Sequence, residues 1–186
     1  MPAHLPPAPE LVLRGYLHAK DENRPHLLQA VFAEDALLEV RNKASNIEFP
    51  AVTHGRDAIA DVLVRRFNQT YENITSFYMA RPPAGAVAFA CDWLVVMTEK
   101  DGGCVRVGCG RYEWALRASA PCLASALRIT IEVMQVLPAA RFDEVFAWVG
   151  RMSYPWSSAG EVAGFAPRPE SLAGVLQYLG RDVSGV

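Results

Sequence analysis

Four polar residues stand where they could take part in chemistry. Glu132 is flanked by apolar residues in the run ITIEVM, and a carboxylate in such surroundings must be paired, hydrogen-bonded or neutral. Tyr16 falls on the apolar stripe of the first predicted helix, Tyr112 lies in a predicted strand, and His54 precedes the third predicted helix. A carboxylate and hydroxyl donors beside an apolar pocket could take a proton from carbon and stabilise the negative charge that develops. We therefore treat these four residues as candidate catalytic groups.

Each candidate also has a structural interpretation. Glu132 could pair with an arginine on a neighbouring strand, and Asp92 in ACDWLV raises the same question. The arginines available are Arg106, Arg111 and Arg128. Tyr16 could be a core residue whose hydroxyl is bonded at the rim, and His54 could cap the next helix, line the rim or face solvent. For Glu132 and Asp92 the structural interpretation is favoured.

Two glycines accompany Tyr112 on one face of its predicted strand. Gly108, Gly110, Tyr112 and Trp114 alternate along the run GCGRYEW, and glycines on one face leave either a concave gap or a bend. The pattern fits a pocket floor or close packing equally well. Aromatic and methionine side chains of the strands form the core, and some should also line a pocket. The candidate lining residues are Phe77, Met79, Trp93, Met97, Trp114 and Met134.

The sequence has no motif for a metal or a cofactor. The histidines show no paired ligand spacing, and no G-x-S-x-G motif or phosphate-binding glycine loop is present. We therefore expect neither a cofactor nor a metal. The four cysteines form no C-x-x-C pair, so we expect them to be reduced in the native protein. They are Cys91, Cys104, Cys109 and Cys122.

Composition bounds the class of protein. The chain has 186 residues, of which 51% are hydrophobic, as expected for one globular domain. The formal net charge is −2 and no long basic run occurs, which argues against nucleic-acid binding. No apolar run reaches the roughly 18–20 residues of a membrane span. The start, MPAHLPPAPE, lacks the pattern of a secretory signal, so we expect a cytoplasmic protein.

The order of predicted elements indicates an α+β fold. Helices are predicted first, a short strand lies between them, and four long antiparallel strands follow before further helices. The strand pair around Lys100–Gly103 has the glycine-rich connection of a hairpin. The predicted helices are 9–20, 25–32, 53–67, 142–149 and about 172–179; the predicted strands are 34–40, a short one near 47–49, and 73–82, 86–100, 104–117 and 127–138.

The long strands are apolar on both faces. Five consecutive apolar residues, 93–97, leave no polar side for water. One face should pack on the N-terminal helices, and the other should be covered by a second subunit or by the C-terminal helices. We expect a homodimer, built mainly on this second face.

Two short motifs carry a family resemblance. The run FAEDALLEV after the second helix, the run HGRDAI opening the third, and the four long strands resemble the superfamily of ketosteroid isomerase, scytalone dehydratase and the SnoaL-like polyketide cyclases. This nuclear-transport-factor-two-like resemblance covers residues 9–138. It implies a curved antiparallel sheet packed on N-terminal helices, a cone-shaped, cystatin-like roll. Residues 1–8 would form an extended leader, and residues 139–186 a C-terminal helical extension packed on the same domain.

The resemblance also implies roles for particular positions. The family's catalytic base falls on Val40, which cannot move a proton but would line the pocket. Glu39 is adjacent, but a one-residue offset turns a strand side chain to the opposite face. Tyr16 stands where the family keeps an oxyanion tyrosine, and Tyr112 lies roughly at the place of a protonated aspartate. The isomerase mechanism is not carried over, so we expect no meaningful turnover of 3-oxo-Δ5 steroids.

Three functions remain open at this point. The chain could be a cofactor-independent cyclase, isomerase or dehydratase that acts on an apolar, oxygenated small molecule. It could instead bind such a molecule without catalysis, which the valine at position 40 favours. A third possibility is a structural subunit like the small subunit of aromatic-ring dioxygenases, in which catalysis belongs to the partner chain.

Overall fold

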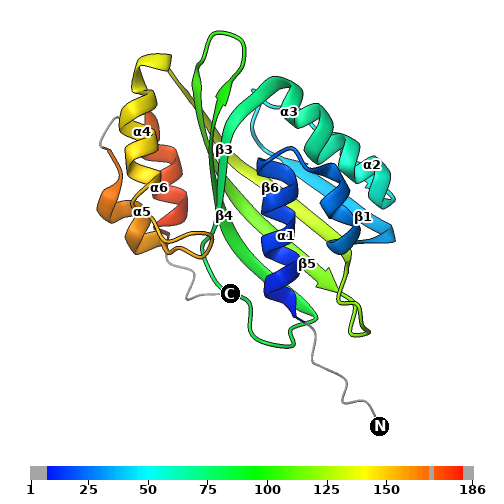
Figure 1. The fold of residues 1–186 in the computed structure, drawn as a ribbon. Coiled ribbons are helices and arrows are strands. Elements are labelled where there is room, and N and C mark those ends of the chain that lie inside the picture. Colours follow the sequence, from blue (N-terminus) through cyan, green and yellow to red (C-terminus); the bar gives the residue numbers. More distant parts are fainter. Residues whose placement is uncertain (1–7, 168–169, 182–186) are drawn as a thin grey trace.

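A six-stranded sheet in the order β2-β1-β6-β5-β4-β3 forms the centre of the molecule. We describe residues 8–167 and 170–181 of a computed structural model, so most of the expected leader at 1–8 lies outside the described residues. The sheet curves around α1, which lies in its concave side (Figure 1). Neighbouring strands are antiparallel except for β1 and β6, which are parallel, so the sheet is mixed. The strands are β1 (Phe32–Asn42), β2 (Val52–His54), β3 (Tyr71–Tyr78), β4 (Ala88–Glu99), β5 (Val105–Leu116) and β6 (Ala124–Leu137).

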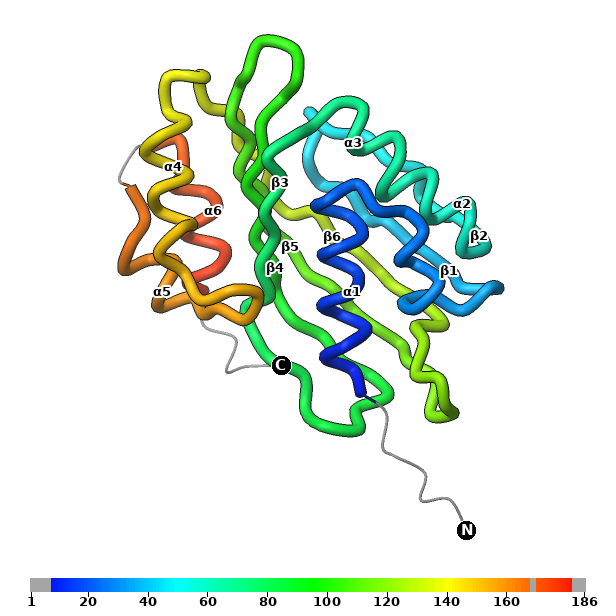
Figure 2. The backbone as a smooth tube through the Cα atoms, viewed as in Figure 1, coloured from blue at the N-terminus to red at the C-terminus, as the bar shows by residue number. Residues whose placement is uncertain are grey.

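The N-terminal helices fill the concave face of the sheet. Helix α1 (Pro9–Asp21) buries the predicted stripe of Leu13, Tyr16 and Leu17 completely. A second helical stretch, residues 56–70, lies beside α1 and packs over β1 (Figure 2). It runs without a break through α2 (Arg56–Ala60), a π-helical stretch η2 (Asp61–Arg66) and α3 (Phe67–Thr70). The fold is therefore α+β, with helices and sheet in separate layers.

Two local predictions are wrong. The helix predicted over 25–32 is a short 3₁₀ helix, η1 (Pro25–Ala30), and β1 begins already at Phe32. Residues 47–49 form no strand, because side chains hold this segment: Asn42 Nδ2 donates to Ile47 O (2.5 Å), and Asn46 Nδ2 donates to Met134 O (2.9 Å). The short strand β2 lies further along, where it pairs with β1.

The chain's own C-terminal helices cover the convex face of the sheet. Along β4, Trp93, Val95 and Met97 belong to the concave-side core, whereas Leu94 and Val96 pack with the C-terminal helices. This alternation accounts for the apolar residues on both faces of the strand. Of the two covers that the sequence left open, a second subunit or the C-terminal helices, the helices are the one that the structure shows. The helices are α4 (Phe142–Val149), α5 (Ala159–Phe165), η4 (Glu170–Leu172) and α6 (Ala173–Leu179). The expected homodimer stays a prediction, but these helices occupy the face on which it was to form.

A short strap joins the two faces of the sheet. Residues 153–157, between α4 and α5, run along the end of the edge strand β3. Tyr78 N donates to Pro155 O and Ser157 N donates to Tyr78 O, each at 2.8 Å. Trp156 stacks on the Tyr78 ring with centroids 5.1 Å apart, so the strap also reaches the concave-side core. In the described part of the chain, no helix has the length and apolar character needed to cross a bilayer.

A candidate ligand-binding cavity

An apolar cavity of about 50 Å³ lies between α1, the 56–70 helix and the concave face of the sheet. Four of the predicted lining residues contribute to it: Val40, Trp93, Met97 and Met134. The remaining wall is aliphatic or aromatic, apart from the hydroxyls of Tyr16 and Tyr112 and the side chain of Lys20. Such a lining, with few polar groups, is typical of sites for small apolar ligands.

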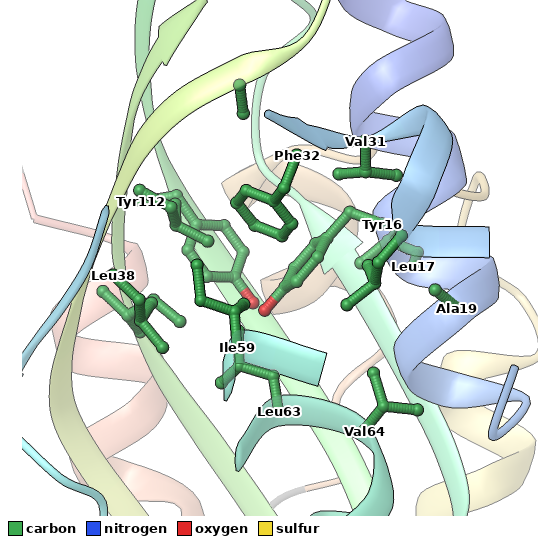
Figure 3. Packing of buried hydrophobic residues seen from close by; sticks show 14 of the residues in the cluster. Tyr16, Leu17, Ala19, Val31, Phe32, Leu38, Ile59, Leu63, Val64 and Tyr112 are labelled. Atoms are coloured by element: carbon green, nitrogen blue, oxygen red, sulfur yellow. The ribbon is translucent and has the colours of Figure 1, made fainter. Parts of the chain in front are cut away.

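The hydroxyls of Tyr16 and Tyr112 face each other at the cavity. Their oxygens point to one place from opposite sides, α1 and β5 (Figure 3). The two rings meet edge to face with centroids 5.8 Å apart. Tyr16 Oη is buried and has no hydrogen-bond partner of good geometry among the described residues, and the same holds for Trp93 Nε1. The cavity therefore presents hydrogen-bond donors that the protein itself leaves unused.

Burial keeps both tyrosines protonated. Removal from water raises the pKa of Tyr16, and the nearby Tyr112 hydroxyl offsets this only in part. Burial likewise raises the pKa of Tyr112 well above its ordinary value. Because desolvation disfavours the phenolate, these groups act as neutral donors at physiological pH and not as bases.

Lys20 lies one helical turn after Tyr16 and also lines the cavity. Its ammonium donates to Asp21 Oδ1 (2.5 Å) and to Ser76 Oγ (2.8 Å). It also lies 5.4 Å from the centroid of Phe67, another lining residue. Asp21 in turn accepts from Ser76 N at 2.8 Å, so the carboxylate is well satisfied. The network ties the end of α1 to β3 and places a paired cation at the cavity wall.

No aspartate, glutamate or histidine of the described residues lines the cavity. Val40 stands on the wall, at the position where the resemblance places the base. Glu39 points to the other face of the sheet, where it accepts from Arg128 Nη2 at 2.8 Å. In the described residues, no three or more metal-ligating side chains gather at one place either.

Glu132 lies away from the cavity, on the convex side. It is the extra residue of a bulge, because Cys109 pairs with Val133 while Gly110 pairs with Ile131. Its carboxylate accepts from Lys43 Nζ at 2.8 and 2.9 Å. The partner is thus a lysine of the irregular segment after β1 and none of the three arginines considered. The bulge also explains how Ile131 and Met134, three positions apart, both line the cavity.

The three arginines pair with other carboxylates. Arg106 Nε lies 2.6 Å from Glu99 Oε1, and Arg128 bonds Glu39. Arg111 lies 3.3 Å from Asp92, which also accepts from Tyr178 Oη and from Arg181. Asp92 thereby links β4 to the end of α6, as its structural interpretation requires.

Four further candidates lie outside the cavity wall. His54 is exposed at the end of β2, and no side chain caps the helix after Gly55. Phe77 and Met79 pack on the convex side with the C-terminal helices. Trp114 is buried deeper in the cone, with its ring 5.2 Å from Tyr16.

The two glycines of β5 serve close packing. A Cβ on Gly110 would lie 1.9 Å from Thr130 O and 2.9 Å from the Trp93 ring, and one on Gly108 would lie 2.4 Å from Met134 Cε. Trp93 and Met134 fold over the strand into the space that the glycines leave. Since both side chains line the cavity, the glycines shape its floor indirectly.

A second depression, of about 230 Å³, adjoins the cavity on its outer side. The two share Ile47, Phe49 and Phe67. The rings of Phe49 and Phe67 stack with centroids 6.1 Å apart, so this pair separates the cavity from the outer depression. Sequence reasoning missed Phe49, Phe67 and Lys20. The spacing of Lys20 from Tyr16 on the first helix is a signal that could have found Lys20.

This chain resembles known proteins in its fold and not in its sequence. No protein-family profile and no curated protein sequence matches this chain. Among solved structures, a nuclear transport factor 2 (NTF2-like) superfamily protein from Salmonella enterica subsp. enterica serovar Typhimurium str. LT2 matches with a TM-score of 0.53 and 16% identity, over 68% of this chain and 94% of that one. The chain therefore has the NTF2-like fold, as the resemblance implied.

Two other neighbours illustrate what this fold supports. A hexachlorocyclohexane dehydrochlorinase (LinA, type 2) matches with a TM-score of 0.55 and 14% identity, over 70% of this chain and 86% of that one. A computationally designed 17-OHP binder matches with a TM-score of 0.52 and 14% identity, over 68% of this chain and 96% of that one. One neighbour is thus named as an enzyme and the other as a binder.

Proposed function

We propose that this chain binds a small, largely apolar molecule that carries a carbonyl oxygen, and that it does so without chemistry at carbon. The proposal rests on one observation above all: the Tyr16 hydroxyl is buried at an apolar cavity, and among the described residues only the Tyr112 hydroxyl lies near enough to pair with it, so at least one O–H of the two has no acceptor. Tyr112 aims a second hydroxyl at the same place (Figure 3). A ligand oxygen placed there would accept from one or both.

The energetic argument favours such a ligand. A buried donor without a partner costs about 1–3 kcal/mol, and a ligand that supplies the acceptor recovers this. The apolar wall adds the burial of the ligand's hydrocarbon part. Met97 and Met134 have flexible side chains, which can shift to widen a cavity that is now narrow.

Binding is favoured over catalysis because the described residues that line the cavity include no carboxylate or histidine that could take a proton from carbon. Among the described lining residues, the ionisable side chains are two tyrosines that burial keeps protonated and a lysine held by a carboxylate. An isomerase, cyclase or dehydratase needs a general base or acid of suitable pKa within reach of the substrate. The dehydrochlorinase and the designed binder share only the fold with this chain, so neither decides between catalysis and binding in this cavity.

The test compares two probes of the same planar shape. Acetophenone carries a carbonyl oxygen, and α-methylstyrene carries a methylene group in its place. Binding is followed by NMR through the indole N–H of Trp93, assigned with Trp93→Phe. We expect acetophenone to bind roughly 2–10-fold more tightly, the equivalent of one hydrogen bond. Tyr16→Phe should reduce the difference and Tyr16→Phe combined with Tyr112→Phe should reduce it further, whereas Tyr154→Phe, which removes a half-exposed hydroxyl elsewhere, should preserve it.

Two results would contradict the proposal. Equal binding of both probes, or binding of neither, would mean that the tyrosine hydroxyls do not select an oxygen. Accelerated exchange of the acetophenone methyl protons with deuterated water, lost in Tyr16→Phe, would instead support an enzyme that abstracts a proton from carbon.

A further inference from the structure

Lys20 of the cavity wall is paired with Asp21, a carboxylate that does not itself line the cavity. Lys20 and Asp21 are nearly excluded from water, with side chains 7% and 6% exposed. The Lys20 ammonium has three N–H groups. One donates to Asp21 and one to Ser76. In the described chain, no residue accepts the third. The wall therefore holds one more donor for a ligand oxygen, next to a carboxylate that already neutralises the cation.

Tyr16 and Lys20 present their donors on the same face of α1. They are four residues apart, which places their side chains one above the other on a helix. Both line the cavity, with Tyr112 opposite on β5. A ligand that fills the cavity is thus bounded by neutral hydroxyls at one level and, at the next, by Lys20, whose ammonium is paired with Asp21.

We propose that Asp21 makes this cavity select neutral oxygen acceptors, such as ketones or esters, and reject carboxylates. The inference rests on the proposed binding function and specifies its ligand class. A neutral oxygen can accept from Tyr16, Tyr112 or Lys20 without adding charge. A carboxylate would lose its hydration and bring a second negative charge beside Asp21, where the single ammonium is already neutralised.

The electrostatic field in the cavity agrees with this geometry. The negative charge of Asp21 contributes to raising the pKa of Tyr16 and of Tyr112, after burial as the main cause. The carboxylate is therefore felt at the hydroxyls despite its pairing with Lys20. An anionic ligand bound there would meet the same unfavourable field that disfavours the phenolates.

The first experiment needs no variant. Benzoate has the planar shape of acetophenone, with a charged oxygen in place of the methyl group. Near neutral pH we expect wild-type protein to bind benzoate at least about tenfold more weakly than acetophenone, the equivalent of one pKa unit of charge repulsion. Benzoate binding as tight as acetophenone binding would overturn the proposal.

The second experiment reverses the selection. Asp21→Asn removes the negative charge and leaves the Lys20 cation unneutralised, so the benzoate-to-acetophenone affinity ratio should rise at least about tenfold. The matched control is Glu22→Gln, which makes the same change of net charge at a side chain that is 43% exposed. Its ratio should equal that of wild type. An unchanged ratio in Asp21→Asn, or an equal rise in Glu22→Gln, would refute a role for Asp21.

The two proposals fail in different ways. If acetophenone does not bind in preference to α-methylstyrene, the proposed function is wrong. If acetophenone binds with that preference but benzoate binds as well, the function stands and the role of Asp21 is wrong. Should Asp21→Asn not fold, equal binding of benzoate and acetophenone by the wild-type protein would still refute the role of Asp21.

Discussion

At the scale of single residues, the most unusual feature is a group of three buried tyrosines. Tyr16, Tyr78 and Tyr112 lie against one another in the concave-side core. Burial raises the pKa of each above its ordinary value of 10.0. Tyr78 differs from Tyr16 because its hydroxyl is satisfied, donating to Leu13 O at 2.8 Å.

These tyrosines predict a loss of stability in alkali. Below about pH 10 each is protonated in both the folded and the unfolded chain. Above that pH the unfolded chain releases these protons first, so the free energy of unfolding falls as pH rises toward the folded-state pKa. Urea titrations from neutral pH to about pH 11 should show this decline, and it should be shallower in Tyr16→Phe. A stability that stays level over this range would contradict the burial of the tyrosines.

Glu132→Gln should cost little stability. The apolar neighbours of Glu132 in the sequence suggested a pair with an arginine in apolar surroundings. The pair with Lys43 is partly solvated, because the lysine side chain is 62% exposed and the glutamate 20%. We expect a loss of at most about 1 kcal/mol. Asp92→Asn gives the contrast: its side chain is 10% exposed and has three partners, so about 2 kcal/mol should be lost, as for hydrogen bonds to a charged group. Chemical denaturation measures the free energy of unfolding of both variants. Equal losses would show that the exposure of the two carboxylates does not determine their contribution to stability.

At the scale of elements, the meeting of β4, β5 and β6 determines the cavity floor. Trp93 and Met134 fold across β5 where Gly110 and Gly108 leave room. In β6, the bulge at Glu132, two residues before Met134, returns Met134 to the concave side. Glycine positions and bulge position together set which side chains reach the cavity.

Gly110→Ala should therefore be severely destabilising. The added methyl group would lie 1.9 Å from Thr130 O, a backbone atom that cannot move without breaking the β5–β6 ladder. We expect a loss of more than about 3 kcal/mol or failure to fold, as for overpacking with backbone displacement. Gly164→Ala in α5 is the control, because its Cβ would meet nothing within 4 Å and alanine favours the helix. Thermal melting of both variants measures the difference. Similar melting points would contradict the close packing of Gly110 against Thr130.

The sequence was informative about elements with a strong period. The apolar stripe of α1, the long strands and the hairpin after β4 were all predicted, because periodicity and turn residues are local signals. The parallel pairing of β1 with β6 and the absence of a strand at 47–49 were not predicted. Both depend on contacts with segments far along the chain, such as the bond from Asn46 to Met134 O.

The candidate site was predictable in part. The family resemblance placed Val40 at the pocket, Trp93 and Met97 were expected among the aromatic and methionine side chains of the core, and Tyr16 followed from the helix stripe. Glu132 was expected among the candidates because its neighbours are apolar. The bulge that turns it outward leaves no mark in the local sequence, and neither does the lysine that reaches it from residue 43.

At the scale of the whole molecule, the C-terminal helices act as the second cover of the sheet. Trp148 is 2% exposed in this layer, and its Nε1 donates to Val162 O at 3.2 Å. The uncovered part of the convex face carries charged side chains instead, among them Arg128 with Glu39 and Glu113. A homodimer would have to use a surface other than the apolar strands that first suggested it.

Trp148→Ala tests this division of the surface. Loss of the indole should cost about 3–5 kcal/mol and loosen the helices over Leu94 and Val96, so that molecules associate through the bared strands. Trp148→Phe keeps most of the buried area and should cost less. Sedimentation velocity combined with urea titration measures both effects. A destabilised Trp148→Ala that sediments like wild type would show that the strands do not drive association.

The strap at residues 153–157 has a further consequence. An edge strand whose backbone groups are free can recruit the strand of another molecule and start a β-aggregate. Here the end of β3 already has its N–H and C=O engaged by Pro155 and Ser157 of the same chain. The segment that carries the chain from α4 to α5 thereby also blunts the edge. Variants that release it should be prone to amyloid-like assembly even when both layers of helices remain folded.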